Sequence, residues 1–235
     1  MYYLDDKEFG RVYISLRSHM RNITMRWRGG NLSMNAPVGV TRQQLEQALN
    51  EFRPRLRLSK AGDSLSYHVG QVIQCYGFTI TIAEQDREPH LILFGHNDNN
   101  ITVSVPRGID INSPHAKKWI SKALKTVVHD RAPAVLLPLA RSVSDRLGVA
   151  PSRYEIGRGL RKLGHCTRTD KVIQLSANLA FLPQELIELI ICHELAHITH
   201  MNHSPQFHAQ VNTYVGGREK ELEARLKAFA WPVMV

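Results

Sequence analysis

Residues 183–208 restrict the fold more than any other segment, because they place polar side chains inside an apolar helical pattern. Pro183 stands where the first residue of a helix is favoured, and apolar residues follow it at helical spacing. These residues are Leu186, Leu189, Ile190, Leu195, Ala196 and Ile198. His193, Glu194 and His197 interrupt the pattern, although an unpaired polar group in a buried helix costs about 1–3 kcal/mol. The segment is therefore predicted to be a mostly buried helix whose polar residues share a common partner.

The spacing of these polar residues is suited to holding a metal ion. His193 and His197 lie four positions apart, so their imidazoles project from one helix face and can both bind one ion at about 2.0–2.1 Å. Glu194 points to a neighbouring angle, from which it can reach a metal-bound water without being a ligand itself. The pattern predicts Zn²⁺ between the two histidines and Glu194 as the general base. The competing interpretation is a set of core histidines bonded to backbone beside a paired glutamate.

The residues after this helix predict a bend. Asn202 tolerates the left-handed conformation that ends a helix. Ser204 and Pro205 then supply the N-cap and the first residue of a following helix. His203 lies at the break between the two helices.

A catalytic zinc site of the open tetrahedral kind needs a third protein ligand and a water molecule. A straight helix would carry His200 about 10.5 Å along the axis from His193, at about 1.5 Å per residue. The bend instead allows His203 to return toward the ion, so we choose His203 as the third ligand. His200 and His208 remain alternatives. Their competing interpretations are a surface residue and a residue that packs beside the ligands, respectively.

At these residues the sequence resembles the YgjP-like metallopeptidase family and, more distantly, the SprT-like and WLM zinc proteases. The resemblance rests on H-E-L-A-H at 193–197, N-H-S at 202–204, Phe207, the approach Leu175, Leu179 and Pro183, and A-P-V-G-V-T-R-Q-Q-L at 36–45. It covers both ends of the chain and is less clear over residues 55–112. It implies a zincin-like fold, with His193, His197 and His203 as metal ligands and Glu194 as the catalytic base.

The sequence departs from the family pattern upstream of the helix. Where the family has Trp-Gly-Ser-Cys, this chain has Leu163, Gly164, His165 and Cys166. The two replacements fall at Leu163 and His165. We therefore expect a different cleft wall near Cys166, and the resemblance does not fix the substrate.

Composition and charge place the chain among globular proteins. Hydrophobic residues make up 43% and charged residues 22%, which excludes a disordered, collagen-like or coiled-coil chain. No apolar run approaches the roughly 18 residues of a membrane span. The N-terminus carries acids where a signal peptide has bases, and the three cysteines lack a C-x-x-C pair, so we expect a cytoplasmic protein with reduced thiols.

The first hundred residues predict antiparallel strands. Polar and apolar residues alternate over 23–27 and 32–36 on either side of Gly29-Gly30, which indicates a β-hairpin, with 12–16 pairing beside it. Thr41 and Gln44 form a capping box for a helix that we expect to end at Pro54. Further strands are predicted at 76–82, 91–94 and 101–105.

Helical spacing replaces this alternation after Ser113-Pro114. One or two helices are predicted up to Leu147, interrupted at Pro133 and Pro138, followed by strands at 154–159 and 172–176. The predicted fold class is α+β, divided at residue 112. Residues 1–112 form an antiparallel β-rich part with one helix near 41–53. Residues 113–235 form a zincin-like metal-binding catalytic part with a small antiparallel sheet.

The leading functional hypothesis is a zinc-dependent metallopeptidase acting on peptide or protein substrates. His165, Arg161 and Tyr154 are candidates for stabilising an oxyanion, and the strand at 172–176 is a candidate edge for an extended peptide.

Two alternatives follow from the net charge of +9. One is metal-dependent hydrolysis of nucleotide phosphoanhydrides, with the phosphates held by the basic residues of 114–180. The other is a non-enzymatic zinc-containing module that binds nucleic acid through basic faces. The absence of a strand motif that interleaves aromatic and basic residues argues mildly against this nucleic-acid-binding alternative.

Overall fold

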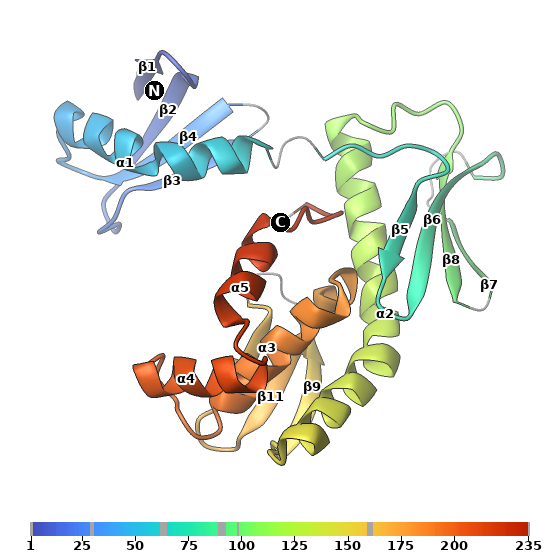
Figure 1. Ribbon diagram of the computed structural model, residues 1–235. Helices are drawn as coiled ribbons and strands as arrows, with labels where there is room; N and C mark the ends of the chain where they lie inside the picture. Colours follow the sequence, from blue (N-terminus) through green and yellow to red (C-terminus); the bar gives the residue numbers. More distant parts are fainter. Residues whose placement is uncertain are drawn as a thin grey trace. The chain divides into compact units, whose positions relative to one another are not determined.

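The computed structural model describes residues 2–28, 31–61, 65–88, 93–97, 99–158 and 162–234. Its fold class is α+β, as predicted, with three small sheets and helices concentrated toward the C-terminus (Figure 1). The chain forms two compact units, Met1–Leu65 and Ser66–Val235. No helix among the described residues is long and apolar enough to span a membrane.

The first unit is a four-stranded sheet with one helix. Its elements are β1 (Tyr2–Asp6), β2 (Gly10–Arg17), β3 (Thr24–Arg28), β4 (Asn31–Pro37) and α1 (Arg42–Ala61). The sheet order is β1-β2-β4-β3. The predicted hairpin is confirmed, because β3 and β4 pair antiparallel with Trp27 opposite Leu32, while Gly29-Gly30 lies outside the described residues. Strand β2 pairs beside β4 as expected, but in parallel, so the sheet is mixed.

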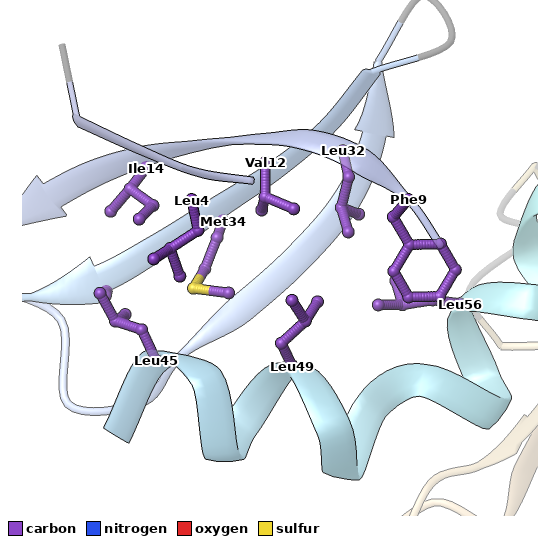
Figure 2. Packing of buried hydrophobic residues seen from close by; sticks show 10 residues of the cluster. Leu4, Phe9, Val12, Ile14, Leu32, Met34, Leu45, Leu49 and Leu56 are labelled. Atoms are coloured by element: carbon purple, nitrogen blue, oxygen red, sulfur yellow. The ribbon is translucent and has the colours of Figure 1, made fainter. Parts of the chain in front are cut away.

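Helix α1 covers one face of this sheet and builds a core with it (Figure 2). Leu45 and Leu49 of α1 point at Met34 and its apolar neighbours from the strands. The capping box is confirmed: the Thr41 N–H donates to Gln44 Oε1 at 2.9 Å, and the Gln44 N–H donates to Thr41 Oγ1 at 3.3 Å.

The expected end of this helix at Pro54 is wrong, since α1 continues to Ala61. An interior proline costs about 3 kcal/mol. Leu56, two residues farther, is buried in the core, and burying a leucine contributes roughly 1.5–3 kcal/mol. The indole N–H of Trp27 also donates to the Leu56 carbonyl at 3.2 Å. Packing after the proline therefore offsets its cost.

The second unit begins with another four-stranded sheet. Its strands are β5 (Val72–Cys75), β6 (Phe78–Gln85), β7 (Leu93–Asn97) and β8 (Asn100–Pro106), in the order β5-β6-β8-β7. Strands lie at 76–82 and 101–105 largely as predicted, and β7 begins within the predicted 91–94, of which residues 91–92 lie outside the described residues. The expectation of antiparallel pairing fails for one pair, because β6 and β8 run parallel. The chain returns through edge strand β7 before it reaches β8, so the crossover places β8 in the same direction as β6.

A single long helix, α2 (Pro114–Leu147), follows and lies beside both sheets of this unit (Figure 1). Its N-cap is Ser113, whose hydroxyl accepts a hydrogen bond from the Ala116 N–H at 3.2 Å. The predicted interruptions at Pro133 and Pro138 are wrong. Buried residues run along the whole helix and include Ala132 and Leu136 next to the prolines, so packing on both sides keeps it continuous.

A three-stranded sheet, one short 3-10 helix and three α-helices complete the described part of the second unit. The strands are β9 (Arg153–Gly157), β10 (Gly164–Cys166) and β11 (Val172–Ser176), in the order β10-β11-β9, with β11 and β9 parallel. The short helix η2 (Ala177–Phe181) precedes α3 (Gln184–Ala196), α4 (Pro205–Tyr214) and α5 (Glu219–Ala228). The antiparallel expectation thus holds for β10 with β11 but not for β11 with β9.

The compact units divide after Leu65, whereas the change of hydrophobic period divides the sequence after residue 112. The difference arises because the sheet of β5–β8 belongs to the same unit as α2, which contacts β8 as well as β9. That the metal-binding part begins at residue 113 stays a prediction.

Candidate metal centre

Helix α3 carries two of the predicted site residues near its C-terminal end. It begins at Gln184, one residue later than expected, because Pro183 is its N-cap instead of its first residue, and its buried residues include Leu195 and Ala196. His193 is half-buried within the last turn, and His197 is the C-cap with helical dihedral angles of −67° and −13°. The i and i+4 relation therefore persists at the helix end, and the two imidazole centroids lie 5.0 Å apart.

The bend after α3 brings a third imidazole to the same place. His203 lies in the connection to α4, whose N-cap is Ser204, with Pro205 next, as predicted. Its ring centroid is 5.1 Å from that of His193 and 4.8 Å from that of His197. Asn202 does not adopt the expected left-handed conformation; Lys171 is the one non-glycine residue with positive φ in the described part of the chain. The helix ends in a turn with right-handed dihedral angles instead.

The nitrogen atoms of these three imidazoles converge on one point. Each of His193, His197 and His203 offers a ring nitrogen, and these atoms all lie within 4.8 Å of one another. The Nε2 atoms of His193 and His203 are 3.1 Å apart. Two nitrogens bound to one tetrahedral ion at about 2.0–2.1 Å would be about 3.3 Å apart. The observed spacing therefore fits the donor set of a common cation.

A hydrogen bond fixes the orientation of one of these rings. The Nδ1 atom of His197 lies 2.9 Å from the backbone carbonyl oxygen of His200. A carbonyl oxygen only accepts, so Nδ1 carries the proton and donates it. The Nε2 lone pair of His197 is then left for a cation, as in metal sites where the second ring nitrogen is held by an outer partner.

Phe207 packs against all three imidazoles at once. This residue of α4 is fully buried, stacks on His197 with centroids 4.5 Å apart, and meets His193 and His203 edge-on at 4.8 and 4.9 Å. The sequence marks Phe207 only as part of a resemblance and does not predict this role. The spacing of three residues from the N-cap Ser204 was the available signal, because it places Phe207 on the first turn of α4, over the bend.

The two alternative histidines are placed outside this group. His200 contributes its backbone carbonyl to His197, and its side chain is not among the converging nitrogens. His208 on α4 has its ring centroid 6.3 Å from that of His203. Its Nδ1 atom lies 2.7 Å from Oε1 of the buried Glu219, at the start of α5.

Glu194 follows His193 on α3 and is almost completely buried, with 5% of its surface exposed. Burial raises the pKa of its carboxyl group from the ordinary 4.5 to about 7, although the Cys166 N–H donates a hydrogen bond to the carboxylate, which acts in the opposite direction. Burial likewise lowers the pKa of His193 to about 4. Burial also lowers the pKa of His197, so the helix end combines a carboxyl group of raised pKa with two imidazoles whose neutral, ligand-competent form is favoured.

Gly164 of β10 lies directly against this carboxylate. A Cβ atom at residue 164 would come within 2.5 Å of Glu194 Oε1 and 2.6 Å of its Cγ, closer than side chains tolerate. Gly164 begins β10 and Cys166 ends it, and the backbone N–H of Cys166 donates to the same carboxylate. Both ends of this short strand therefore contact Glu194 and restrict its position. Sequence reasoning missed the contact, since only the glycine in L-G-H-C hinted at a close backbone approach.

The other residues singled out from the sequence have different surroundings. The hydroxyl of Tyr154 lies 2.6 Å from Ser144 Oγ on α2, so it is engaged with that helix. His165 is exposed on β10 and close enough to His197 to contribute electrostatically to its pKa. Arg161 lies outside the described residues. The prediction that residues 172–176 offer a free edge is wrong, because β11 is the middle strand of its sheet and β10 is an edge.

A protein-family model matches most of this chain. Residues 21–229 match the model described as the YgjP-like metallopeptidase domain. The resemblance inferred from the sequence is thereby confirmed, and the matched residues include the three converging histidines and Glu194. A comparison with curated proteins found no match.

Proposed function

The chain belongs to the YgjP-like metallopeptidase family, and from this premise we propose that it is a zinc-dependent peptidase that uses Glu194 as its general base. The observation that carries the proposal is the convergence of three imidazole nitrogens at the end of the helix that also holds a buried glutamate. Membership of a peptidase family supports peptides or proteins as the substrate class.

The donor set favours zinc among the common divalent cations. His193, His197 and His203 would hold the ion, and a site of three imidazoles suits zinc better than magnesium or calcium, which take oxygen ligands. Three protein ligands leave a fourth position open, as in catalytic rather than structural zinc sites. When bound there, zinc lowers the pKa of a coordinated water toward about 7 and polarises a carbonyl group.

The residues of the chain supply the proton transfer and the orientation. Glu194 accepts the proton of the attacking water and passes it to the leaving amine, for which a carboxyl pKa near neutrality is suited. Gly164 and the Cys166 N–H hold the carboxylate in place. The edge strand β10 is the element beside Glu194 that can pair with an extended peptide.

Removal and return of the metal test the proposal. Chelation should abolish cleavage of an unfolded polypeptide, and stoichiometric Zn²⁺ should restore it, because the ion supplies the nucleophilic water. New N-termini identified by mass spectrometry would establish the bond that is cleaved. Nucleoside triphosphates are incubated in parallel; zinc-restored phosphate release without peptide cleavage would overturn the peptidase assignment in favour of phosphoanhydride hydrolysis.

Substitution of Gly164 tests how β10 holds the base. Gly164→Ala should lower turnover by about 100-fold, since displacement of a catalytic group by about 1 Å can have that effect. Zinc content, measured by elemental analysis, should be unchanged, because the three atoms nearest to the added Cβ all belong to Glu194 and none to a histidine. Gly95→Ala is the matched control, as its added Cβ would meet only ordinary contact, at 3.8 Å from Thr102. Full activity of Gly164→Ala would contradict the positioning role.

A further inference from the structure

The first unit has a sheet surface to which the metal centre of the second unit assigns no role. Side chains alternate along β1–β4, so one face packs on α1 and the other faces away from it. We call the second surface the open face and define it by Tyr3, Tyr13, Arg17, Arg26, Ser33 and Asn35. It carries aromatic, cationic and hydrogen-bonding side chains where a merely solvated sheet needs only polar ones.

The strand register places these side chains in a row across the sheet. Tyr3 of β1 lies opposite Tyr13 of β2, Tyr13 lies beside Ser33 of β4, and Ser33 lies opposite Arg26 of β3. Directly opposed residues have Cβ atoms about 4.5–5.5 Å apart. The Arg11 guanidinium lies 4.4 Å from the centroid of the Tyr3 ring. Two aromatic rings and several cationic groups are thus within reach of one extended ligand.

The open face is hollowed rather than flat. A depression of about 460 Å³ is lined by Tyr13, Ser33, Asn35 and Arg17, with His19 and Met20 from the segment after β2 forming its side. This volume falls within the range of about 300–1,000 Å³ that is usual for ligand sites.

Arg17 and Arg26 of this face lack acidic partners among the described residues, whereas Arg11 pairs with Asp5 of the same face at 3.4 Å. Asp6 and Glu8 pair with Arg53 of α1 at 2.8 and 3.0 Å, and this arginine lowers the pKa of Asp6 to about 2. In the part of the chain that the structure describes, no carboxylate forms an ion pair with Arg17 or Arg26, and both side chains are exposed. Arg17 and Arg26 therefore present positive charge to solvent that no carboxylate of the described residues compensates.

We propose that the open face binds single-stranded RNA. Bases stack on Tyr3 and Tyr13, while Arg17 and Arg26 contact phosphates. The hydroxyl of Ser33 and the amide of Asn35 lie between them and bond to base edges or 2′-hydroxyl groups. A duplex does not satisfy this arrangement, because its bases are stacked on each other and do not reach the tyrosines.

The arginines are tested by the salt dependence of binding. Fluorescence anisotropy of a labelled oligouridylate about twelve nucleotides long is measured with the full chain at several salt concentrations. The double variant Arg17→Ala/Arg26→Ala should bind about tenfold more weakly. It should also reduce the slope of log affinity against log salt by about 1.4, because each phosphate that a side chain neutralises contributes about 0.7 to that slope. Arg42→Ala removes an exposed arginine of α1 and should leave both quantities unchanged.

The tyrosines are tested by stacking and by the choice of nucleic acid. Tyr13→Ala should weaken binding about fivefold or more with an unchanged salt slope, and Tyr13→Phe should restore it. Tyr3→Ala, at a half-exposed position, gives the same test without risk to the fold. Equal affinity for oligothymidylate DNA, tighter binding of a hairpin duplex, or tyrosine variants that bind like the parent chain would each overturn the proposal.

Discussion

Replacing Glu194 by glutamine is expected to lower peptide hydrolysis by about 10²–10⁴-fold, the usual contribution of a positioned general base. Glutamine has nearly the same shape, so it preserves the packing against Gly164 and a carbonyl acceptor for the Cys166 N–H. It has no basic oxygen for the proton of the attacking water. Zinc content should remain that of the parent chain, because the three imidazoles are untouched.

The control for this experiment lies on the same helix. Glu185→Gln removes a carboxylate from the first turn of α3, where it pairs with Arg218 and Arg225 on the surface, and should leave turnover unchanged. Initial rates and metal analysis on the same preparations distinguish the two variants. Residual turnover of Glu194→Gln close to that of Glu185→Gln would remove Glu194 from the mechanism.

The second large effect concerns His203, the proposed third ligand. Mutating a residue that only holds a metal ligand in place lowers metal affinity by about 10–100-fold. His203→Ala removes a proposed ligand itself, so it should lower zinc affinity by more than that. The reason is geometric: its Nε2 lies 3.1 Å from that of His193, and without it two nitrogens at the end of α3 must hold the ion alone. Competition with a chromogenic chelator measures the affinity directly.

His200→Ala is the matched comparison, because His200 offers its backbone carbonyl to His197 and its ring is not among the converging imidazoles. Alanine keeps the carbonyl that accepts the hydrogen bond from His197 Nδ1, so zinc affinity should be nearly unchanged. The opposite order of the two variants would make His200 the ligand. A small effect of both would direct attention to His208, which the structure places beside Glu219.

The sequence predicts best where one local rule determines the outcome. The capping box of Thr41 and Gln44, and the N-cap at Ser204 with Pro205 after it, depend on a few neighbouring residues and are found as expected. The convergence of the histidines was predictable for a similar reason. Helical spacing aligns His193 with His197, and a nearby bend needs little chain to return His203 to them.

The failed predictions depend on contacts between distant segments. Proline at 54, 133 and 138 disfavours a helix locally, but packing along α1 and α2 outweighs that preference. Alternating hydrophobicity identifies a strand but does not show which strand pairs with it or in which direction. The parallel pairs and the central position of β11 therefore could not be predicted from it. The open face likewise draws on separate strands, since Tyr3 of β1 and Arg26 of β3 join Tyr13 and Arg17 of β2 only when the sheet forms.

Phe207 gives the metal centre a dependence on one short helix. Its ring touches all three imidazoles, and it belongs to the first turn of α4, only four residues after His203. Opening of that turn would withdraw the supporting ring and release the third histidine in a single event. Retention of an ion by the proposed ligands would therefore be coupled to the local unfolding equilibrium of α4, and a bound cation would in turn protect this helix from fraying.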